Sequence, residues 1–512
     1  KANMSVADRP LASTPDLTQS AAQSYTPPAW SRWLDSGIFF FLALFSILLP
    51  HSIKGGEHAW KIAFFLWLVK LVVRRERPWN QPLTLPLLAY VGLSAVSTAL
   101  SSDPMLSWDR MKIVCLVLTG ITFAQNLYRL EQVRRLMFFL MLSALAVAGF
   151  TAWQYTYGVG VQLVNTPPVP LHQRGFLEKD ILTRIDGVSV HSPSQLRRVV
   201  LSAEPGKSFE VDFLRSFPFH KMRNSATRED FLASGLADNS LRLRRGHPLR
   251  AQGTLGHYVV LAEMLMQLGC VAWALLLSAT PKQRTTQVMM ALIFLSISAA
   301  LIATGTRAAM AGMALGCLTA LLMLARRRSQ YWALAIVVVL VLAATLWVRH
   351  SRGLNWVDRT DSGTQFRVLM WEDGVRLVKQ HPWFGVGMET VRTHWQDWNI
   401  RGFGQFHGVS DFHSTPLQIA VERGLLTLAA WTWFAIAYLV YLFRLAQRCR
   451  VQSRFATGVV AGILGSFIGF LTTSFVHYNL GEEPVVLAVF FFFGIAVAID
   501  RMCRQPNCMD VE

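Results

Sequence analysis

The residues best suited to chemistry in this chain are histidines and arginines at the ends of long apolar runs. His413 comes directly before one such run, in the segment Asp411-Phe-His-Ser-Thr-Pro-Leu417. An imidazole has an unperturbed pKa of about 6.5, so it is mostly neutral at neutral pH and accepts a proton readily. Its spacing to three later residues predicts one shared helix face: Leu417, Ala420 and Gly424. His413 is therefore the candidate general base, and a buried histidine with a packing role is the alternative.

Three arginines are candidates for binding a phosphate or a pyrophosphate: Arg250, Arg307 and Arg367. A guanidinium carries a permanent charge and a planar fork of donors that matches two phosphate oxygens. Arg250 lies before one predicted helix and Arg307 begins another, and the N-terminus of a helix favours anions. The alternatives are snorkelling to the membrane interface for Arg307 and a solvated loop charge for Arg250. His257 and His477 are second-rank candidates for the same site.

The composition predicts that membrane-spanning helices position these side chains. Of the 512 residues, 52% are hydrophobic and 16% are charged, against about 25% charged in soluble globular domains. This composition excludes a disordered chain, a collagen-like repeat and an ordinary cytosolic enzyme. The net charge of +18 would suggest nucleic acid as the partner of a soluble protein. In a membrane protein it reflects the Lys and Arg that gather in cytoplasmic loops, so we expect no nucleic-acid partner.

Twelve stretches have the apolar character and the length, about 17 to 25 residues, that cross a bilayer. They lie at 37–54, 59–73, 83–101, 111–127, 136–158, 254–278, 286–303, 307–325, 331–348, 416–443, 455–476 and 484–500. An even number of spans places both termini on the same side of the membrane. The sequence therefore predicts an all-α polytopic membrane protein with about 12 transmembrane helices.

Basic residues in alternate short loops predict the orientation of these spans. They are Arg74, Arg75, Arg77, Arg129, Arg134, Arg135, Lys282, Arg284, Arg326, Arg327, Arg328, Arg444, Arg448, Arg450, Arg454, Arg501 and Arg504. All of them lie in the cytoplasm, as the positive-inside rule requires, if both termini do. The predicted order is a cytoplasmic tail at 1–36, spans at 37–158, an outer segment at 159–253, spans at 254–348, a second outer segment at 349–415, spans at 416–500 and a cytoplasmic tail at 501–512.

The first outer segment is predicted to hold a small α/β unit. The pattern indicates strands at 181–185, 188–190 and 208–214, turns at 186–187 and 205–206, and a helix at 193–203 that Ser192 caps. Residues 160–163 are a candidate for one further strand. The basic stretch 217–250 is expected to be a solvated charge run, with contact to anionic lipid head groups as the alternative. The core at about 160–215 resembles a bacterial periplasmic PDZ domain, which binds an extended peptide by strand addition. A docking module without a peptide or protein ligand is the alternative.

The second outer segment is predicted to be a helical loop over the membrane. Four apolar residues at helical spacing indicate an amphipathic helix at 365–380: Phe366, Leu369, Met370 and Leu377. Tryptophans along the segment suit anchoring at the interface or stacking on sugar rings: Trp356, Trp371, Trp383, Trp395 and Trp398. The outer segments contain no Asp-x-Asp pair, and Asp358 and Asp361 are expected to belong to a turn, so we expect no metal.

Several of these motifs together resemble the O-antigen ligase family (WaaL-type) and its relatives, the O-antigen polymerases and the protein O-oligosaccharyltransferases. His413-Ser-Thr-Pro-Leu417, followed by Gly424, is similar to the signature that ends the family's large periplasmic loop. Thr304-Gly-Thr-Arg307-Ala-Ala resembles its Thr/Ser-Arg-Gly/Ala segment. Arg367-Val-Leu-Met-Trp371, with His381-Pro-Trp-Phe-Gly385-Val-Gly387, resembles its Arg-x-x-x-Trp and Pro-x-x-Gly-x-Gly stretch. The resemblance covers about residues 250–480.

The resemblance implies an inverting glycosyltransferase of GT-C-type architecture in the bacterial inner membrane, with a periplasmic active site. It implies transfer of a glycan from undecaprenyl pyrophosphate to the lipid A-core oligosaccharide in lipopolysaccharide biosynthesis, without a metal or another cofactor. The expected partners are this lipid-linked donor, the acceptor and membrane lipid. In this reaction His413 is expected to take the acceptor proton, and Arg307, Arg367 and Arg250 to bind the pyrophosphate.

Three other functions remain open at the level of sequence. An O-antigen polymerase uses the same donor with a glycan acceptor, and a protein O-oligosaccharyltransferase uses a protein acceptor. A lipid-glycan flippase or another secondary transporter also suits twelve spans. The predicted clustering of charged and titratable residues at one membrane face counts against a transporter, since transporter sites lie near the bilayer midplane.

Overall fold

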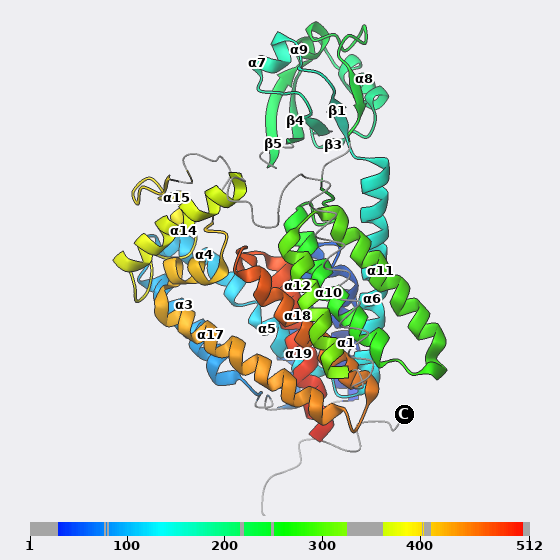
Figure 1. Cartoon of the computed structure of the whole chain (residues 1–512), viewed down its shortest axis with the longest axis vertical. Helices are drawn as coiled ribbons and strands as arrows, with labels where there is room; N and C mark the ends of the chain where they lie inside the picture. The colour runs from blue at the N-terminus through cyan, green and yellow to red at the C-terminus, as the bar shows by residue number, and fades with distance from the viewer. Residues whose placement is uncertain are drawn as a thin grey trace, which may run out of the picture.

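The computed structural model describes residues 29–75, 78, 81–215, 220–246, 250–324, 362–401, 403 and 411–504. Within these residues the chain forms a helical bundle and one small unit with a β-sheet (Figure 1). The predicted span 331–348 lies outside the described residues, as do Trp356, Asp358 and Asp361.

The helices of the bundle come from both halves of the chain. The first half supplies α1 (Arg32–Leu48), α2 (Ile53–Arg74), α3 (Thr84–Ala99), α4 (Pro104–Val114), α5 (Val117–Asn126) and α6 (Leu130–Tyr157). The second half supplies α10 (Tyr258–Ser278), α11 (Arg284–Thr304), α12 (Arg307–Leu324), α17 (Thr415–Cys449), α18 (Arg454–Ser474) and α19 (Glu483–Arg504). A helix satisfies its own backbone polar groups, which is what a lipid environment demands.

Seven helices among the described residues are long and apolar enough to cross a membrane: α6, α10, α11, α12, α17, α18 and α19. This finding confirms an integral membrane protein with many spans, whereas the number twelve stays a prediction. The predicted fourth span, 111–127, is not one helix, because the chain breaks it at residues 115–116 into α4 and α5. The apolar helix α3 has 16 residues, fewer than the about 20 that a perpendicular span needs.

Close packing of α12 against α18 sets the spacing of two site elements. Each helix carries two glycines four residues apart: Gly312 and Gly316 on α12, Gly465 and Gly469 on α18. A Cβ atom on Gly316 would lie 2.3 Å from the carbonyl oxygen of Gly465, so the two backbones touch. Such small-xxx-small pairs let membrane helices approach closely. The packing fixes Arg307, at the start of α12, relative to the loop that follows α18.

The segment between α6 and α10 folds as the predicted α/β unit. Its strands are β1 (Val161–Leu163), β2 (Ile181–Ile185), β3 (Val188–Ser189), β4 (Ser208–Arg215), β5 (His220–Thr227) and β6 (Leu243–Arg245), all paired antiparallel in the order β5-β4-β2-β1-β6, with β3 on β2. Its helices are α7 (Val169–Gln173), α8 (Pro193–Leu201) and α9 (Arg228–Ala233). The predicted strands, turns and Ser192 cap are confirmed, since the Ser192 hydroxyl accepts from the Gln195 amide at 3.2 Å. The likeness to a PDZ domain stays a prediction.

The charges expected to be solvated at 217–250 include exposed arginines, Arg223, Arg242, Arg244 and Arg245, but most of the stretch is also part of the folded unit. It contains β5, α9 and β6. A run of basic residues is not typical of a strand, but here an acidic side chain on the neighbouring strand compensates the charge. Arg223 on β5 binds Asp212 on β4, with Nε 2.7 Å from Oδ1. Apolar residues between them, such as Ala226 and Phe231, lie in the core of the unit.

The α/β unit and the second long segment lie at the same end of the bundle. In Figure 1 the unit stands beyond the top of α6, and α14 (Ser362–Gln380) and α15 (Thr390–Thr393) lie near that end, beside α3, α4 and the start of α17. The predicted amphipathic helix 365–380 is confirmed as α14, which buries Phe366, Met370 and Leu377. The ends of α17 and α19 with their basic residues lie at the opposite end.

Candidate functional site

His413 lies just before α17, in a tight turn with Asp411. Its φ angle is +49°, and α17 begins two residues later at Thr415. Gly424 has φ 81° and ψ 170° and kinks the helix. The predicted helix face shared by His413 and Gly424 is therefore wrong, because the helix starts after the first residue and breaks at the last. The left-handed turn instead lets one Asp411 carboxylate oxygen accept both the backbone amide and the ring of His413.

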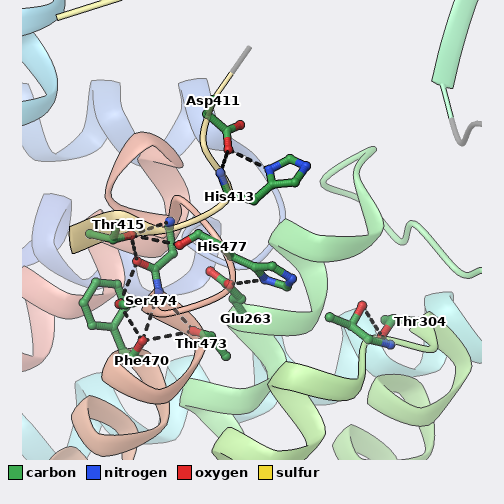
Figure 2. Close-up of polar contacts among 11 residues, drawn as sticks. Glu263, Thr304, Asp411, His413, Thr415, Phe470, Thr473, Ser474 and His477 are labelled. Carbon is green, nitrogen blue, oxygen red and sulfur yellow. Dashed lines mark hydrogen bonds and ion pairs between the residues drawn. The ribbon is translucent and has the colours of Figure 1, made fainter. Parts of the chain in front are cut away.

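The Asp411 carboxylate orients the His413 ring. Nδ1 and the backbone nitrogen of His413 each lie 2.7 Å from Oδ1 of Asp411 (Figure 2). With its proton on Nδ1, the ring presents the Nε2 lone pair away from Asp411. Burial opposes ionisation of Asp411, but the charge and hydrogen bonds of His413 outweigh it, so the pKa of Asp411 lies below its usual value. The His413 side chain is 32% exposed, so reactants have access to it.

A network of hydrogen bonds ties the start of α17 to the loop between α18 and α19. The amide and the hydroxyl of Thr415 both donate to the carbonyl oxygen of His477, at 3.1 and 3.0 Å. The Asn479 side chain accepts from Ser474 at 2.9 Å and donates to the Phe470 carbonyl at 3.0 Å. These contacts hold His413 and His477 on neighbouring backbone segments, as Figure 2 shows.

His477 forms a second histidine–carboxylate pair. Its Nδ1 lies 2.9 Å from Oε1 of Glu263, a residue of α10 that is 0% exposed. The His477 side chain is 14% exposed, less than half of the His413 value. Glu482 precedes α19 and lies close enough to Glu263 and Asp411 for their charges to affect its pKa. Burial first, and then the charges of Glu263 and Asp411, raise the pKa of Glu482 to about 7.

The turn between α11 and α12 places Arg307 at a helix N-terminus. Gly305, with φ +64°, ends α11, and Arg307 is the first residue of α12. The Thr304 hydroxyl accepts from the Thr306 amide at 3.3 Å and donates to the Leu301 carbonyl at 2.6 Å, which fixes the turn. The expectation that Arg307 opens a helix is therefore confirmed, although its role as a ligand of pyrophosphate stays a prediction.

Arg250 lies next to this turn. The amide of Ala251 donates to the Ala303 carbonyl at 3.0 Å, which joins the Arg250 loop to the end of α11. The Arg250 guanidinium lies 4.5 Å from the centre of the Tyr258 ring, on which the His257 ring also stacks. His257 is the N-cap residue of α10. The same helix carries Glu263, so α10 links the arginine group to the His477–Glu263 pair.

Arg367 approaches the site from α14. The preceding residue, Phe366, meets the His413 ring edge-on with 5.6 Å between ring centres. Trp371, one turn further along α14, donates its indole N–H to the Phe412 carbonyl at 3.1 Å. The structure therefore brings the Arg367 turn of α14 against the His413 segment. It places Arg250, His257 and Arg307 in a neighbouring group at the ends of α10, α11 and α12.

The glycines of the segment 381–387 have a structural role beside the kink of α17. The amide of Gly387 donates to the Glu422 carbonyl at 2.8 Å, so the segment pairs with the helix backbone. A Cβ atom on Gly385 would lie 2.4 Å from the carbonyl carbon of Glu422, and one on Gly424 would lie 2.0 Å from the Trp383 oxygen. These positions require glycine because two backbones touch there.

Three acidic residues of the site were not predicted from the sequence: Glu263, Asp411 and Glu482. Glu263 could have been found from the sequence, because a carboxylate inside an apolar span is a functional candidate by default. Asp411 could also have been found from the sequence, since it lies two residues before the candidate base, His413. Glu482 stands beside a second acidic residue at a span start, and its burial near the other two carboxylates is a tertiary property. Among the described residues, no group of three His, Cys, Asp or Glu side chains is arranged to hold a metal ion.

Apolar helices with paired histidines and carboxylates at one end define an integral membrane protein with a polar site at the end of its bundle. The family described as O-antigen ligase matches residues 291–432. This match covers less than half of the chain and shows a domain of the O-antigen ligase family within residues 291–432. The matched stretch contains three predicted site residues, Arg307, Arg367 and His413, and also Asp411. No curated protein matches the chain significantly.

Proposed function

We propose that this protein is an O-antigen ligase that moves a glycan from undecaprenyl pyrophosphate to the lipid A-core at the periplasmic face of the bacterial inner membrane. The family match at residues 291–432 supports a reaction of the ligase or polymerase type in general. The observation that carries the specific proposal is the His413–Asp411 pair, partly exposed at the end of a membrane bundle and flanked by arginine-bearing turns. GT-C-type architecture is part of the same proposal.

In this proposal His413 is the general base. The acceptor oxygen forms a bond to the anomeric carbon of the donor sugar while the bond from that carbon to the pyrophosphate oxygen breaks. The acceptor proton passes to Nε2 of His413, and undecaprenyl pyrophosphate leaves with the bonding electrons. Attack from the face opposite the leaving group inverts the anomeric centre. Asp411 holds the ring and stabilises the imidazolium that forms, as carboxylates do beside catalytic histidines.

His477 is less suited to be the base. Its ring is 14% exposed against 32% for His413, and an acceptor hydroxyl must come within about 3 Å of the base nitrogen. Its bond to Glu263 suits a positioning role, in which His477 helps to hold the donor or the His413 segment. His477 and His257 therefore belong with the residues that line the donor site.

Arginines supply the charge that the leaving group requires. Pyrophosphate is already a good leaving group, so the enzyme must neutralise its charge and has no need to protonate it. Arg307 and Arg250 come from turns that a backbone hydrogen bond joins, and Arg367 comes from α14 beside His413. Three permanent cations and an absent Asp-x-Asp motif support a reaction without metal.

Reconstitution tests the proposal directly. Purified protein in liposomes would receive the lipid-linked glycan with one of three acceptors: lipid A-core, the free glycan repeat or a serine-containing peptide. We expect transfer to lipid A-core, and activity that persists in excess EDTA. Transfer to the free repeat would instead identify a polymerase, and transfer to the peptide a protein O-oligosaccharyltransferase. Movement of unchanged donor across the bilayer, without any transfer, would identify a flippase and overturn the proposal.

A further inference from the structure

A cavity opens at the basic end of the bundle, far from the histidine pairs. It lies where α6 and α18 begin and where the loop from α10 to α11 runs, and its volume is about 290 Å³. Its wall is mostly apolar, with Met137, Met141, Leu275, Met290 and Phe455, and the polar residues Ser278, Gln283 and Thr286 complete it. Two basic side chains, Arg134 and Arg454, line the same cavity.

The charges around this cavity strongly favour an anion. Three segments contribute lining residues at this end: 128–136, 280–286 and 449–456. They carry one acidic residue, Glu131, which contacts Arg134 and Arg135, and seven basic ones: Arg129, Arg134, Arg135, Lys282, Arg284, Arg450 and Arg454. The Arg134 guanidinium lies 5.2 Å from the centre of the Phe455 ring, so this cation stands directly above an apolar wall. A cation on the rim of an apolar cavity is suited to an amphiphile with an anionic head.

The apolar faces that lead away from the cavity suit a hydrocarbon chain. α6 and α11 pack against each other, and both belong to the helices able to cross a membrane. Phe138 and Leu142 on α6 are 48% and 53% exposed, and Leu292 and Leu295 on α11 are 57% and 62% exposed. Since the volume of the cavity is too small for a whole lipid, only the head and the start of a chain enter it, and the chain continues along these faces.

We propose that this cavity binds an anionic glycerophospholipid of the surrounding membrane. Its phosphate lies at Arg134 and Arg454, and its acyl chain lies along α6 and α11. Basic pockets between transmembrane helices bind anionic head groups in this way. A free phosphate would use the two arginines but leave the apolar wall in contact with water, which is why a lipid is the better occupant.

Thermal unfolding of the full chain in a neutral detergent tests this site. We would measure the unfolding midpoint with added phosphatidylglycerol, phosphatidylcholine or inorganic phosphate. A ligand that binds the folded state alone raises the midpoint, and we expect phosphatidylglycerol to raise it by about 2 °C or more. Phosphatidylcholine and phosphate should each raise it by less than half as much.

Matched variants distinguish binding in the cavity from a general effect of positive charge at this end of the bundle. Arg134→Gln with Arg454→Gln should remove the phosphatidylglycerol increment. Lys282→Gln with Arg284→Gln removes the same charge nearby without touching the lining and should keep the increment. Ala279→Leu fills the cavity without changing charge and should also reduce it, which covers the case that the arginine variant is unstable. An equal loss in both charge variants, an equal increment with phosphate alone, or no increment at all would overturn the proposal.

Discussion

At the scale of single residues, the site is organised by two histidine–carboxylate pairs. His413 bonds to Asp411 at 2.7 Å, and His477 bonds to Glu263 at 2.9 Å. In each pair the carboxylate accepts a hydrogen bond from the Nδ1–H group, so Nε2 is the nitrogen left for a reactant. The pairs differ in exposure, which supports His413 as the proposed base, and conservative variants test this proposal.

Replacing His413 by Gln should reduce turnover by roughly 10²-fold or more, because Gln keeps hydrogen bonding but has no basicity. Asp411→Asn should also reduce turnover and should change its pH profile, since the ring loses its charged partner. Initial rates in liposomes across pH 5 to 9 measure both effects. Donor binding to His413→Gln is the control and should stay within about twofold of normal. A folded His413→Gln protein with near-normal turnover would show that His413 has a packing role.

Variants of Arg307 test whether the arginines bind the donor while His413 acts as the base. Arg307→Ala should weaken donor binding as well as turnover, because the guanidinium is proposed to hold the pyrophosphate. Arg307→Lys should restore part of the loss, since Lys supplies the charge without the two-pronged fork. Titration with a fluorescent undecaprenyl pyrophosphate measures binding apart from chemistry. If Arg307→Ala binds the donor normally, the arginine is an interfacial anchor.

The raised pKa of Glu482 predicts that the stability of the folded protein depends on pH. Its pKa rises from 4.5 to about 7 on folding, so the folded state keeps a proton that the unfolded state loses between these values. Stability should therefore fall as pH rises from about 4.5 to about 7, and the cost, at most about 3 kcal/mol, is fully present above that range. Glu482→Gln should raise the unfolding midpoint at pH 8 and leave it nearly unchanged at pH 4. The exposed control Glu178→Gln should show no such difference between the two pH values, and an equal midpoint shift of Glu482→Gln at both would contradict the prediction.

At the scale of elements, helix contacts decide how far apart the charged groups stand. The glycines of α12 and α18 allow backbone contact, and the segment 381–387 pairs with α17 at its kink. Neither contact supplies a reactive group. Both determine where reactive groups lie, because Arg307 begins α12 and His413 precedes α17.

Gly316→Ala tests the contact between α12 and α18. The new methyl group would lie 2.3 Å from the Gly465 carbonyl oxygen, so the helices must separate. We expect a loss of about 1 to 3 kcal/mol in stability and lower turnover, because Arg307 moves relative to the His477 loop. Gly149→Ala on α6, where nothing lies within 4 Å, is the matched control and should be neutral or slightly stabilising. Thermal unfolding and the transfer assay measure both, and equal effects at the two sites would refute the packing argument.

At the scale of the whole molecule, the two long segments and the basic loops lie at opposite ends of the bundle. The α/β unit and α14 stand at the end that carries His413 (Figure 1). Arg134, Gln283 and Arg454 line one cavity at the other end, so three basic loops meet there. This arrangement suits the positive-inside rule, with the site facing out.

Cysteine labelling tests this orientation. Single cysteines introduced at Ser194 in α8 and at Asn399 should react with a membrane-impermeant thiol reagent in spheroplasts. A cysteine at Lys282 should react only after lysis, and the chain without an added cysteine serves as the background. Labelling of Ser194→Cys and Asn399→Cys only after lysis would reverse the predicted topology.

The class of protein and most of its elements follow from local patterns in the sequence. Apolar runs predict membrane helices because the bilayer selects for length and hydropathy, which are local properties. Alternating apolar residues and turn pairs predicted β2, β3 and β4 for the same reason, and His413 and Arg307 stood out because charged groups are costly beside lipid. The family resemblance rested on motifs of a few residues, which are also local.

The tertiary structure alone decided which carboxylate meets which histidine. Glu263 and His477 are 214 positions apart, and no local pattern pairs them. β5 escaped prediction because its charges are compensated across the sheet by residues of β4. The turn at His413 and the kink at Gly424 also came from outside α17, since the His477 loop holds its start and the segment 381–387 holds its bend. Contacts between distant segments set these geometries, because a buried polar group must find a partner wherever the fold supplies one.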